Sequence, residues 1–136
     1  MTRLRVNVDG GARGNPGPAA IGVVIRSGEE VVAEVSERIG EATNNVAEYR
    51  ALLAGIARAG ELGATELELV GDSELVVKQV RGEYKVKNQG IRPLHAEVLD
   101  ALGSFESWTI EHVRREENAE ADALVNQALD AGGTAP

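Results

Sequence analysis

The chain has 136 residues, the length of one domain, and its 43% hydrophobic and 26% charged residues are typical of globular proteins. It lacks cysteine and has only two histidines, so disulfides and thiol nucleophiles are excluded and any metal would be held mainly by oxygen. The net charge of −8 argues against unspecific polyanion binding, although residues 78–92 are locally basic. Because the sequence shows no apolar run of bilayer-spanning length and no signal peptide, we expect a cytoplasmic protein that does not bind membranes.

The first half of the chain predicts three antiparallel strands and a helix. Alternating apolar and polar residues indicate a strand over 3–9, which the glycine- and proline-rich segment 10–18 ends. Strands over 20–26 and 31–39 follow, with a turn at 27–29 between them. Residues 43–59 lack proline and have apolar residues at helical spacing, which predicts the first helix.

The second half alternates strands with helices. We expect a strand over 65–71, a short helix over 72–80, a helix over 93–102, a strand over 108–114 and a closing helix over 118–131. Strands separated by helices pair in parallel, so the fold class is α/β with a mixed sheet and flanking helices. The domain covers residues 1–131, and we expect 132–136 to be a disordered tail.

Four carboxylates occupy positions that are not typical of ordinary solvent-exposed charged residues. Asp9 and Asp72 end predicted strands, whereas Glu48 and Asp122 share helix faces with apolar residues. Taken singly, each of the first three has a structural alternative: Asp9 an Asx-turn, Asp72 a helix cap, and Glu48 a capping box that begins at Asn45. Buried carboxylates need neutralisation, and few cationic residues lie beside these four, so together they favour a divalent cation.

A cluster of oxygen ligands predicts a particular chemistry. It favours Mg²⁺ or Mn²⁺, and two such ions about 3.5 to 4 Å apart are the usual apparatus of phosphodiester cleavage. Segment 10–18 is neither a Walker loop nor a Rossmann fingerprint; its glycines allow close approach to a ligand, or simply a wide turn. Thr43, Asn44 and Asn45 either flank the metal site or cap the helix. His112 lies inside the last predicted strand and is not assigned to catalysis.

Five motifs, in this order, resemble those of type 1 ribonuclease H, the endonuclease that cuts RNA within RNA/DNA hybrids. The resemblance covers the chain from Arg3 to about Leu129, and it implies a ribonuclease H-like fold with a five-stranded mixed sheet. The motifs are Asp9-Gly-Gly-Ala-Arg-Gly-Asn-Pro-Gly-Pro18, Thr43-Asn-Asn-Val-Ala-Glu-Tyr-Arg-Ala-Leu52, Gly71-Asp-Ser-Glu74, Tyr84-Lys-Val-Lys-Asn88 and Glu117-Asn-Ala-Glu-Ala-Asp122.

The resemblance also implies roles for individual residues. The matches to the family's catalytic, metal-binding carboxylates, which hold two Mg²⁺ ions with Mn²⁺ as a substitute and yield 5′-phosphate and 3′-hydroxyl ends, are Asp9, Glu48, Asp72 and Asp122. The matches to its minor-groove contacts are Gly10, Gly11, Asn15, Asn44 and Asn45. The matches to its pocket for a DNA-strand phosphate, which helps to reject duplex RNA, are Arg26, Thr43 and Asn88.

Two departures indicate a compact branch of the family. Residues 83–92 are too short for the lysine-rich protrusion of many bacterial members, and Lys85 and Lys87 are a modest substitute. Residues 114–118 are too short for a loop with an assisting histidine, and Arg115 is the candidate replacement that aids release of product or metal. The expected partner is an RNA/DNA hybrid, and we expect a monomer.

Two other functions remain as alternatives. A nuclease of related fold, such as a 3′ exonuclease, is disfavoured by the asparagine pair and the phosphate pocket. A non-catalytic module that binds hybrids is disfavoured because all four carboxylates are present.

Overall fold

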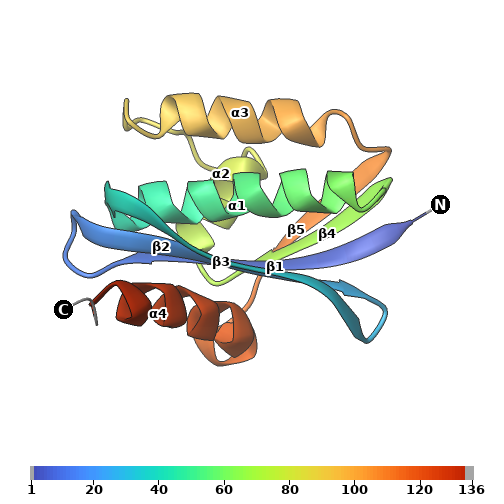
Figure 1. The fold of residues 1–136 in the computed structure, drawn as a ribbon. Helices are drawn as coiled ribbons and strands as arrows, with labels where there is room; N and C mark the ends of the chain where they lie inside the picture. The colour runs from blue at the N-terminus through green and yellow to red at the C-terminus, as the bar shows by residue number, and fades with distance from the viewer. Residues whose placement is uncertain (1, 134–136) are drawn as a thin grey trace.

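The N-terminal strands β1 (Arg3–Ala12), β2 (Gly17–Ser27) and β3 (Glu30–Ala42) form an antiparallel meander. In the computed structural model, which describes residues 2–133, strands β4 (Glu66–Gly71) and β5 (Ser107–His112) extend the meander in parallel. The resulting strand order is β3-β2-β1-β4-β5 (Figure 1). The predicted α/β class and five-stranded mixed sheet are confirmed.

Helices cover both faces of the sheet (Figure 1). On one face, α1 (Asn44–Glu61) packs on β1 and β2, while α2 (Glu74–Val80) and α3 (Arg92–Leu102) complete the layer. On the other face, the 3₁₀ helix η1 (Arg115–Asn118) leads into α4 (Ala119–Gly133), which packs on β1, β2 and β3. No helix within residues 2–133 combines the length and the apolar composition needed to cross a membrane.

The main core lies between the sheet and α1. Val6 and Val8 point from β1 toward Tyr49, Leu52 and Ile56, which recur at helical spacing on one side of α1 and are all buried. Burying each such aliphatic side chain contributes about 1.5 to 3 kcal/mol. A smaller apolar cluster under α4 holds that helix against the opposite face of the sheet.

Several boundaries differ from the sequence prediction: β2 begins at Gly17 rather than 20, β3 continues to Ala42 rather than 39, and β5 ends at His112 rather than 114. β1 continues beyond Asp9, because Gly10, Gly11 and Ala12 still pair with β2, whereas we expected the glycines to end the strand. α4 continues to Gly133, whereas we expected a tail from residue 132. The rest of that tail, residues 134–136, lies outside the described residues.

Candidate active site

The parallel pairing of β1 with β4 brings Asp9 and Asp72 together. The ladder ends with Val8 opposite Gly71, so the next residue of each chain segment carries its carboxylate at the same edge of the sheet. β1 remains paired with β2 at this point, with Asp9 opposite Gly22. The carboxyl edge of parallel strands is where open α/β sheets bind ligands, and the predicted convergence of these two side chains is therefore present.

Glu48 reaches the same edge from α1. A Cβ at Gly10 would overlap the carbonyl oxygen of Ala47, so only glycine lets α1 approach β1 this closely. The Gly10 N–H donates to Glu48 Oε1 at 3.2 Å and orients the carboxyl group. A close approach between strand and helix thus positions the third acidic side chain.

The structural alternatives for the carboxylates are not realised. Thr43 caps α1, since its hydroxyl accepts from the Val46 N–H at 3.2 Å, and Glu48 turns to Gly10 rather than back to Asn45. Ser73, not Asp72, caps α2 by accepting from the Val76 N–H at 3.4 Å. With Asp9 in the continuing strand rather than in an Asx-turn, all three carboxylates are available to the site.

Asp9, Glu48 and Asp72 form a tight cluster, in which one oxygen of each lies within 4.8 Å of the others. Asp9 and Glu48 are each only 7% exposed. None of the ion pairs found within residues 2–133 involves these three carboxylates. Two of the three donors are buried, all are oxygen and none is ion-paired within the described range, which is the environment that suits Mg²⁺ or Mn²⁺.

Burial and mutual repulsion raise the pKa values of two carboxyl groups of the cluster. Burial, followed by the charge of Asp72, raises the pKa of Asp9 to about 7. Burial, followed by the charges of Asp9 and Asp72, raises the pKa of Glu48 well above its ordinary value. Cations bound between the carboxylates would remove this repulsion, so the residues present fit a divalent metal site.

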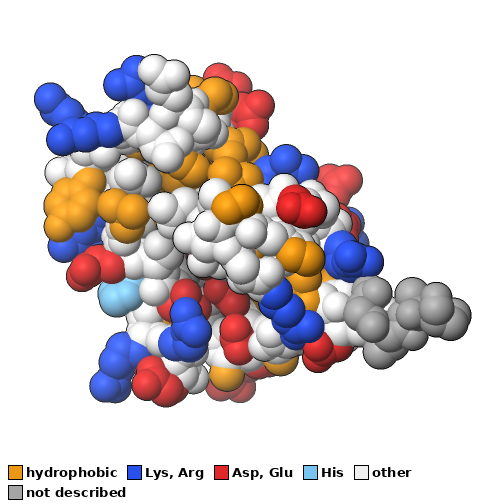
Figure 2. Space-filling model, turned by 90° about the vertical axis from the view of Figure 1, so that its left-hand side faces the viewer, with side chains coloured by type: hydrophobic (Ala, Val, Ile, Leu, Met, Phe, Trp, Pro, Cys, Tyr) orange, Lys and Arg blue, Asp and Glu red, His pale blue; other side chains and the backbone are white. Residues whose placement is uncertain are grey.

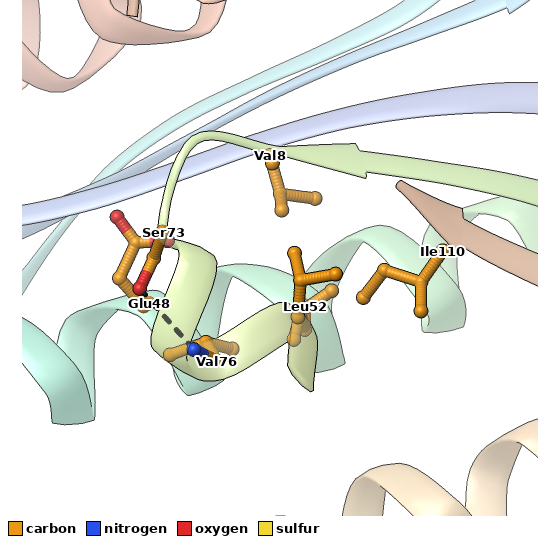
Figure 3. A pocket seen from close by; sticks show the side chains of 8 residues that line it. Val8, Glu48, Leu52, Ser73, Val76 and Ile110 are labelled. Carbon is orange, nitrogen blue, oxygen red and sulfur yellow. Dashed lines mark hydrogen bonds between the residues drawn. The ribbon is translucent and has the colours of Figure 1, made fainter. Parts of the chain in front are cut away.

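Apolar side chains lie behind Glu48 and explain its burial. Figure 3 shows Glu48 beside Ser73 at one end of a small pocket, with Val8, Leu52 and Ile110 toward the other end. The pocket holds only about 10 Å³, room for a single water at most. Water therefore has little access to Glu48 from this side, and the charged form is disfavoured.

Asp122 lies across from the cluster on α4. A Cβ at Gly22 would overlap the Ala121 carbonyl oxygen, so this glycine lets the start of α4 approach β2 directly beside Asp9. Asp122 lines a pocket of about 320 Å³ together with Asp9, Glu48 and Arg115, which we call the acidic pocket. Its charge contributes to the raised pKa of Asp9, but it is not part of the tight cluster.

Figure 2 views this end of the molecule, where acidic side chains gather in a hollow with basic side chains beside it. Gly10, Gly11 and Asn44 also line the acidic pocket. A neighbouring groove of about 520 Å³ collects further predicted substrate contacts, and we call it the asparagine groove. The predicted residues that line it are Asn15, Thr43, Asn44, Asn45 and Asn88.

Hydrogen bonds join the two cavities at Asn44. Its Oδ1 accepts from the Ala12 N–H at 2.9 Å, and its own backbone N–H donates to Asn15 Oδ1 at 3.0 Å. The β1–β2 turn and the start of α1 are thereby fixed to each other. These two hydrogen bonds define the edge between the acidic pocket and the asparagine groove.

The placement of Arg26 with Thr43 and Asn88 is wrong. Thr43 follows Ala42, which pairs with Gly17 at the start of β2, whereas Arg26 lies nine residues further along that strand, roughly 30 Å away. There its guanidinium Nη2 lies 2.7 Å from both carboxylate oxygens of Glu120 on α4. Arg26 therefore does not belong to the asparagine groove.

Arg115 and His112, which lie near the position of the missing histidine loop, differ in their surroundings. Arg115 lines the acidic pocket and makes no ion pair with any residue of the described range, whereas its neighbour Arg114 pairs with Glu117 at 3.3 Å. His112 is the exposed last residue of β5, opposite Gly71. Its position inside the strand is as predicted.

Two buried asparagines, Asn7 and Asn118, were missed by sequence reasoning. Asn118 donates hydrogen bonds to Asp72 and to the backbone of β1, and Asn7 donates to Asn118. Asn118 lies inside a matched motif, which is the only signal that pointed to it. Asn7 occupies a polar position in the alternating pattern of β1, which predicts a solvent-facing side chain. In the structure, η1 and α4 cover that face of the strand.

The strand order, the helices on both faces and the carboxylates at the edge of β1 and β4 define a ribonuclease H-like domain. A family model described as "Reverse transcriptase-like" matches residues 7–128. Ribonuclease HI of Halobacterium salinarum is 46% identical over 129 residues, which cover 94% of this chain and 65% of that protein. Ribonuclease H of Erythrobacter litoralis is 31% identical over 144 residues, with 96% and 98% coverage. The chain belongs to the ribonuclease H family.

Solved structures agree with this assignment. The crystal structure of RNase H1 from Halobacterium salinarum has a TM-score of 0.93 at 45% identity, covering 95% of this chain and 98% of that one. LC11-RNase H1 in complex with an RNA/DNA hybrid has a TM-score of 0.91 at 41% identity, with 96% and 99% coverage. Some relatives are longer: the chain spans 65% of the Halobacterium protein and 36% of the bifunctional protein Rv2228c of Mycobacterium tuberculosis, to which it is 45% identical over 131 residues, 95% of this chain.

Proposed function

We propose that the protein is an endoribonuclease that hydrolyses the RNA strand of RNA/DNA hybrids and requires two divalent metal ions. The observation that carries this proposal is the cluster of Asp9, Glu48 and Asp72, which opens onto the acidic pocket and adjoins the asparagine groove. The complex of LC11-RNase H1 with an RNA/DNA hybrid, a structure of the same fold, supports the choice of substrate.

The four carboxylates hold the metal ions in this proposal. Asp9, Glu48 and Asp72 provide the shared oxygen cluster, and Asp122 provides a further carboxylate across the acidic pocket. The chemistry that bound cations supply is Lewis-acid activation of water and stabilisation of the leaving 3′-oxygen, as in paired-metal hydrolysis, which yields 5′-phosphate and 3′-hydroxyl ends. Mg²⁺ is the proposed ion and Mn²⁺ its substitute, since both prefer oxygen ligands.

The asparagine groove binds the hybrid in this proposal. Amide side chains both donate and accept hydrogen bonds, so Asn15, Asn44 and Asn45 can bind sugar hydroxyls in the shallow minor groove. Thr43 and Asn88 bind a phosphate of the DNA strand, without Arg26. Gly10 and Gly11 let the backbone of β1 approach the RNA strand closely.

Arg115 has an auxiliary role in the proposal. Its guanidinium is a positive group among the carboxylates of the acidic pocket, where it can attract a phosphate as it leaves or weaken the hold on a cation. The cytoplasmic location and the monomeric state expected from the sequence stay predictions.

The direct test is cleavage of an end-labelled RNA/DNA hybrid in the presence of Mg²⁺, Mn²⁺ or EDTA, beside RNA/RNA and DNA/DNA duplexes of the same sequence. We expect internal cuts in the RNA strand of the hybrid alone, and none in EDTA. Hybrid binding without cleavage in either metal would replace the proposal by a binding module. Cuts that proceed only from a 3′ end would replace it by an exonuclease.

A further inference from the structure

We propose that Asn118 is a positioning residue that fixes the carboxylate of Asp72 against β1 and thereby sets the affinity of the acidic cluster for divalent cations. The proposal rests on the function proposed above only in that it takes the cluster as a metal site. Asn118 does not touch the reacting atoms; it acts through Asp72.

Asn118 uses its whole amide group in hydrogen bonds. Its Nδ2 donates to Asp72 Oδ2 at 3.1 Å and to the carbonyl oxygen of Val8 at 2.8 Å, while its Oδ1 accepts from Asn7 Nδ2 at 3.0 Å. The side chain is only 1% exposed, so water does not compete for these bonds. The position therefore accommodates one orientation of one side chain.

The partners determine that orientation. A carboxylate and a backbone carbonyl both accept hydrogen bonds only, so the NH₂ group of Asn118 must face Asp72 and Val8. Asn7, 9% exposed, then supplies the donor that the Asn118 oxygen requires. A flipped amide would place oxygen against oxygen at two contacts and leave buried groups unpaired.

These bonds lie where β1 and β4 part. Val8 and Gly71 are the last pair of the parallel ladder, and the next residues are Asp9 and Asp72. Beyond this pair no ladder bond holds the two acidic residues at a fixed separation. Asn118 spans the gap, because it binds the residue before Asp9 and the side chain of Asp72 at once.

A neutral amide suits this role better than a charged group. It holds one oxygen of Asp72 and leaves the other free, and it does not cancel the negative charge that attracts a cation. Asn118 also ends η1 directly before α4, which carries Asp122 one helical turn later. The same segment thus orients Asp72 and delivers the carboxylate on the opposite wall of the acidic pocket.

The test measures binding of Mn²⁺ alone, without nucleic acid, by titration calorimetry of metal-free protein. Asn118→Ala removes both donors, and Asn118→Asp keeps the shape but replaces them with acceptors. Loss of a group that orients a metal ligand typically weakens metal affinity about 10- to 100-fold, and we expect a loss in this range for both variants. Asn7→Ala keeps the direct bond to Asp72 and should weaken Mn²⁺ binding less than either.

Ser36→Ala is the matched control for a purely structural effect. It removes a hydrogen bond of 2.7 Å from Ser36 to the Leu124 carbonyl, which ties α4 to β3 two strands across from Asp9 and involves none of the three clustered carboxylates. Unfolding in urea with EDTA gives the stability of each variant. We expect Ser36→Ala to lose stability but to keep its Mn²⁺ affinity. If Asn118→Ala does not fold, Asn118→Ser, which retains one donor, takes its place.

Hybrid cleavage adds a second readout. Positioning through Asp72 predicts that the Asn118 variants are slow at limiting Mn²⁺, recover at saturating Mn²⁺ and keep the KM for the hybrid. Mn²⁺ affinities equal to that of the unchanged protein, or losses in proportion to stability in all variants including Ser36→Ala, would overturn the inference. Failure of the unchanged protein to cut the hybrid would refute the proposed function instead, and the Mn²⁺ affinities would still decide the role of Asn118.

Discussion

Glu68 in β4 and Asp72, the residue directly after β4, lie four residues apart in opposite surroundings. Glu68 is paired with Arg5 at 3.0 Å and lies 3.9 Å from Arg3. Asp72 accepts a hydrogen bond from the neutral amide of Asn118, faces Asp9 and Glu48, and makes no ion pair within residues 2–133. Among the described residues, arginines thus pair with the carboxylate within the sheet, and none pairs with the carboxylate at its edge.

Helix α4 repeats the contrast over two residues. Glu120 is paired with Arg26 at 2.7 Å on the surface, whereas Asp122 lines the acidic pocket. Exposed ion pairs contribute about 0 to 1 kcal/mol each, so the pairs of Glu68 and Glu120 are ordinary surface features. Asp9, Glu48 and Asp72 differ from these because they lie close together, are largely buried and have no ion pair within the described range, and this difference locates the metal site.

The largest effect is expected from Asp9→Asn. It removes a charge and a metal ligand where several kcal/mol of charge stabilisation is at stake, so hybrid cleavage should fall on the order of 10³-fold. The fold should persist, since the substitution also relieves repulsion within the cluster. Single-turnover cleavage in Mg²⁺ and urea unfolding in EDTA measure the two effects, and near-normal turnover would refute the assignment of Asp9.

The stability of the metal-free protein should fall as the pH rises. Asp9 has a pKa of about 7 in the folded protein against an ordinary value of 3.8, so between these pH values the folded state binds more protons than the unfolded state. Stability is therefore highest at the acid end of this window and declines toward neutral pH, by about 1 to 3 kcal/mol. Urea unfolding in EDTA at pH 5 and pH 8 measures the decline.

Two controls sharpen the pH prediction. Asp9→Asn should flatten the decline, because the titrating group is gone. Mn²⁺ at about 100 times its Kd should stabilise the unchanged protein by about 2.7 kcal/mol at pH 8. A metal-free protein that is more stable at pH 8 than at pH 5 would contradict the buried-carboxylate account.

A smaller effect distinguishes the asparagine groove from Arg26. Asn45→Ala removes a hydrogen-bonding group from the groove and should raise the KM for the hybrid about three- to tenfold, the equivalent of one net hydrogen bond. Arg26→Gln should leave KM unchanged and lower stability by less than about 1 kcal/mol. A raised KM for Arg26→Gln would restore Arg26 to the phosphate pocket.

The smallest effect is expected at Arg115. Arg115→Ala should lower kcat about threefold, equivalent to about 0.6 kcal/mol, because a positive group beside the departing phosphate is lost. The matched control is Arg114→Ala, whose side chain pairs with Glu117 rather than lining the acidic pocket. Equal kcat values for the two variants would remove the auxiliary role of Arg115.

Local pattern predicted the elements of this fold well. Period-two alternation predicted β1 and β4, apolar or alternating stretches predicted β2 and β3, and helical spacing predicted α1 through Leu52 and Ile56. The end of β1 was missed since Gly10 and Gly11 have no side chains to show a pattern, although their backbones still pair with β2. A strand end that is set by backbone hydrogen bonding alone cannot be predicted from the hydrophobic pattern of the sequence.

The site residues that stand out by residue type and local position could be predicted from the sequence. Those whose role depends on their distance from other residues in the folded chain could not. Asp9, Glu48 and Asp72 stood out because carboxylates at strand ends and on apolar helix faces need a reason. Arg26 was misplaced because its match to the family gave no distance along β2. Asn118 was missed because its role depends on two hydrogen bonds to parts of the chain that are far apart in sequence. One goes to Val8 in β1 and the other to Asp72 after β4.

Glu68 in β4 and Asp72 directly after it provide the most direct test of the central claim. Cleavage of an end-labelled RNA/DNA hybrid in Mg²⁺ would be compared for the unchanged protein, Asp72→Asn and Glu68→Gln. The two substitutions neutralise the unpaired carboxylate after β4 and the paired carboxylate within it. The account predicts that the unchanged protein and Glu68→Gln cut the RNA strand and that Asp72→Asn does not. Equal cleavage by all three proteins, or by none, would contradict it.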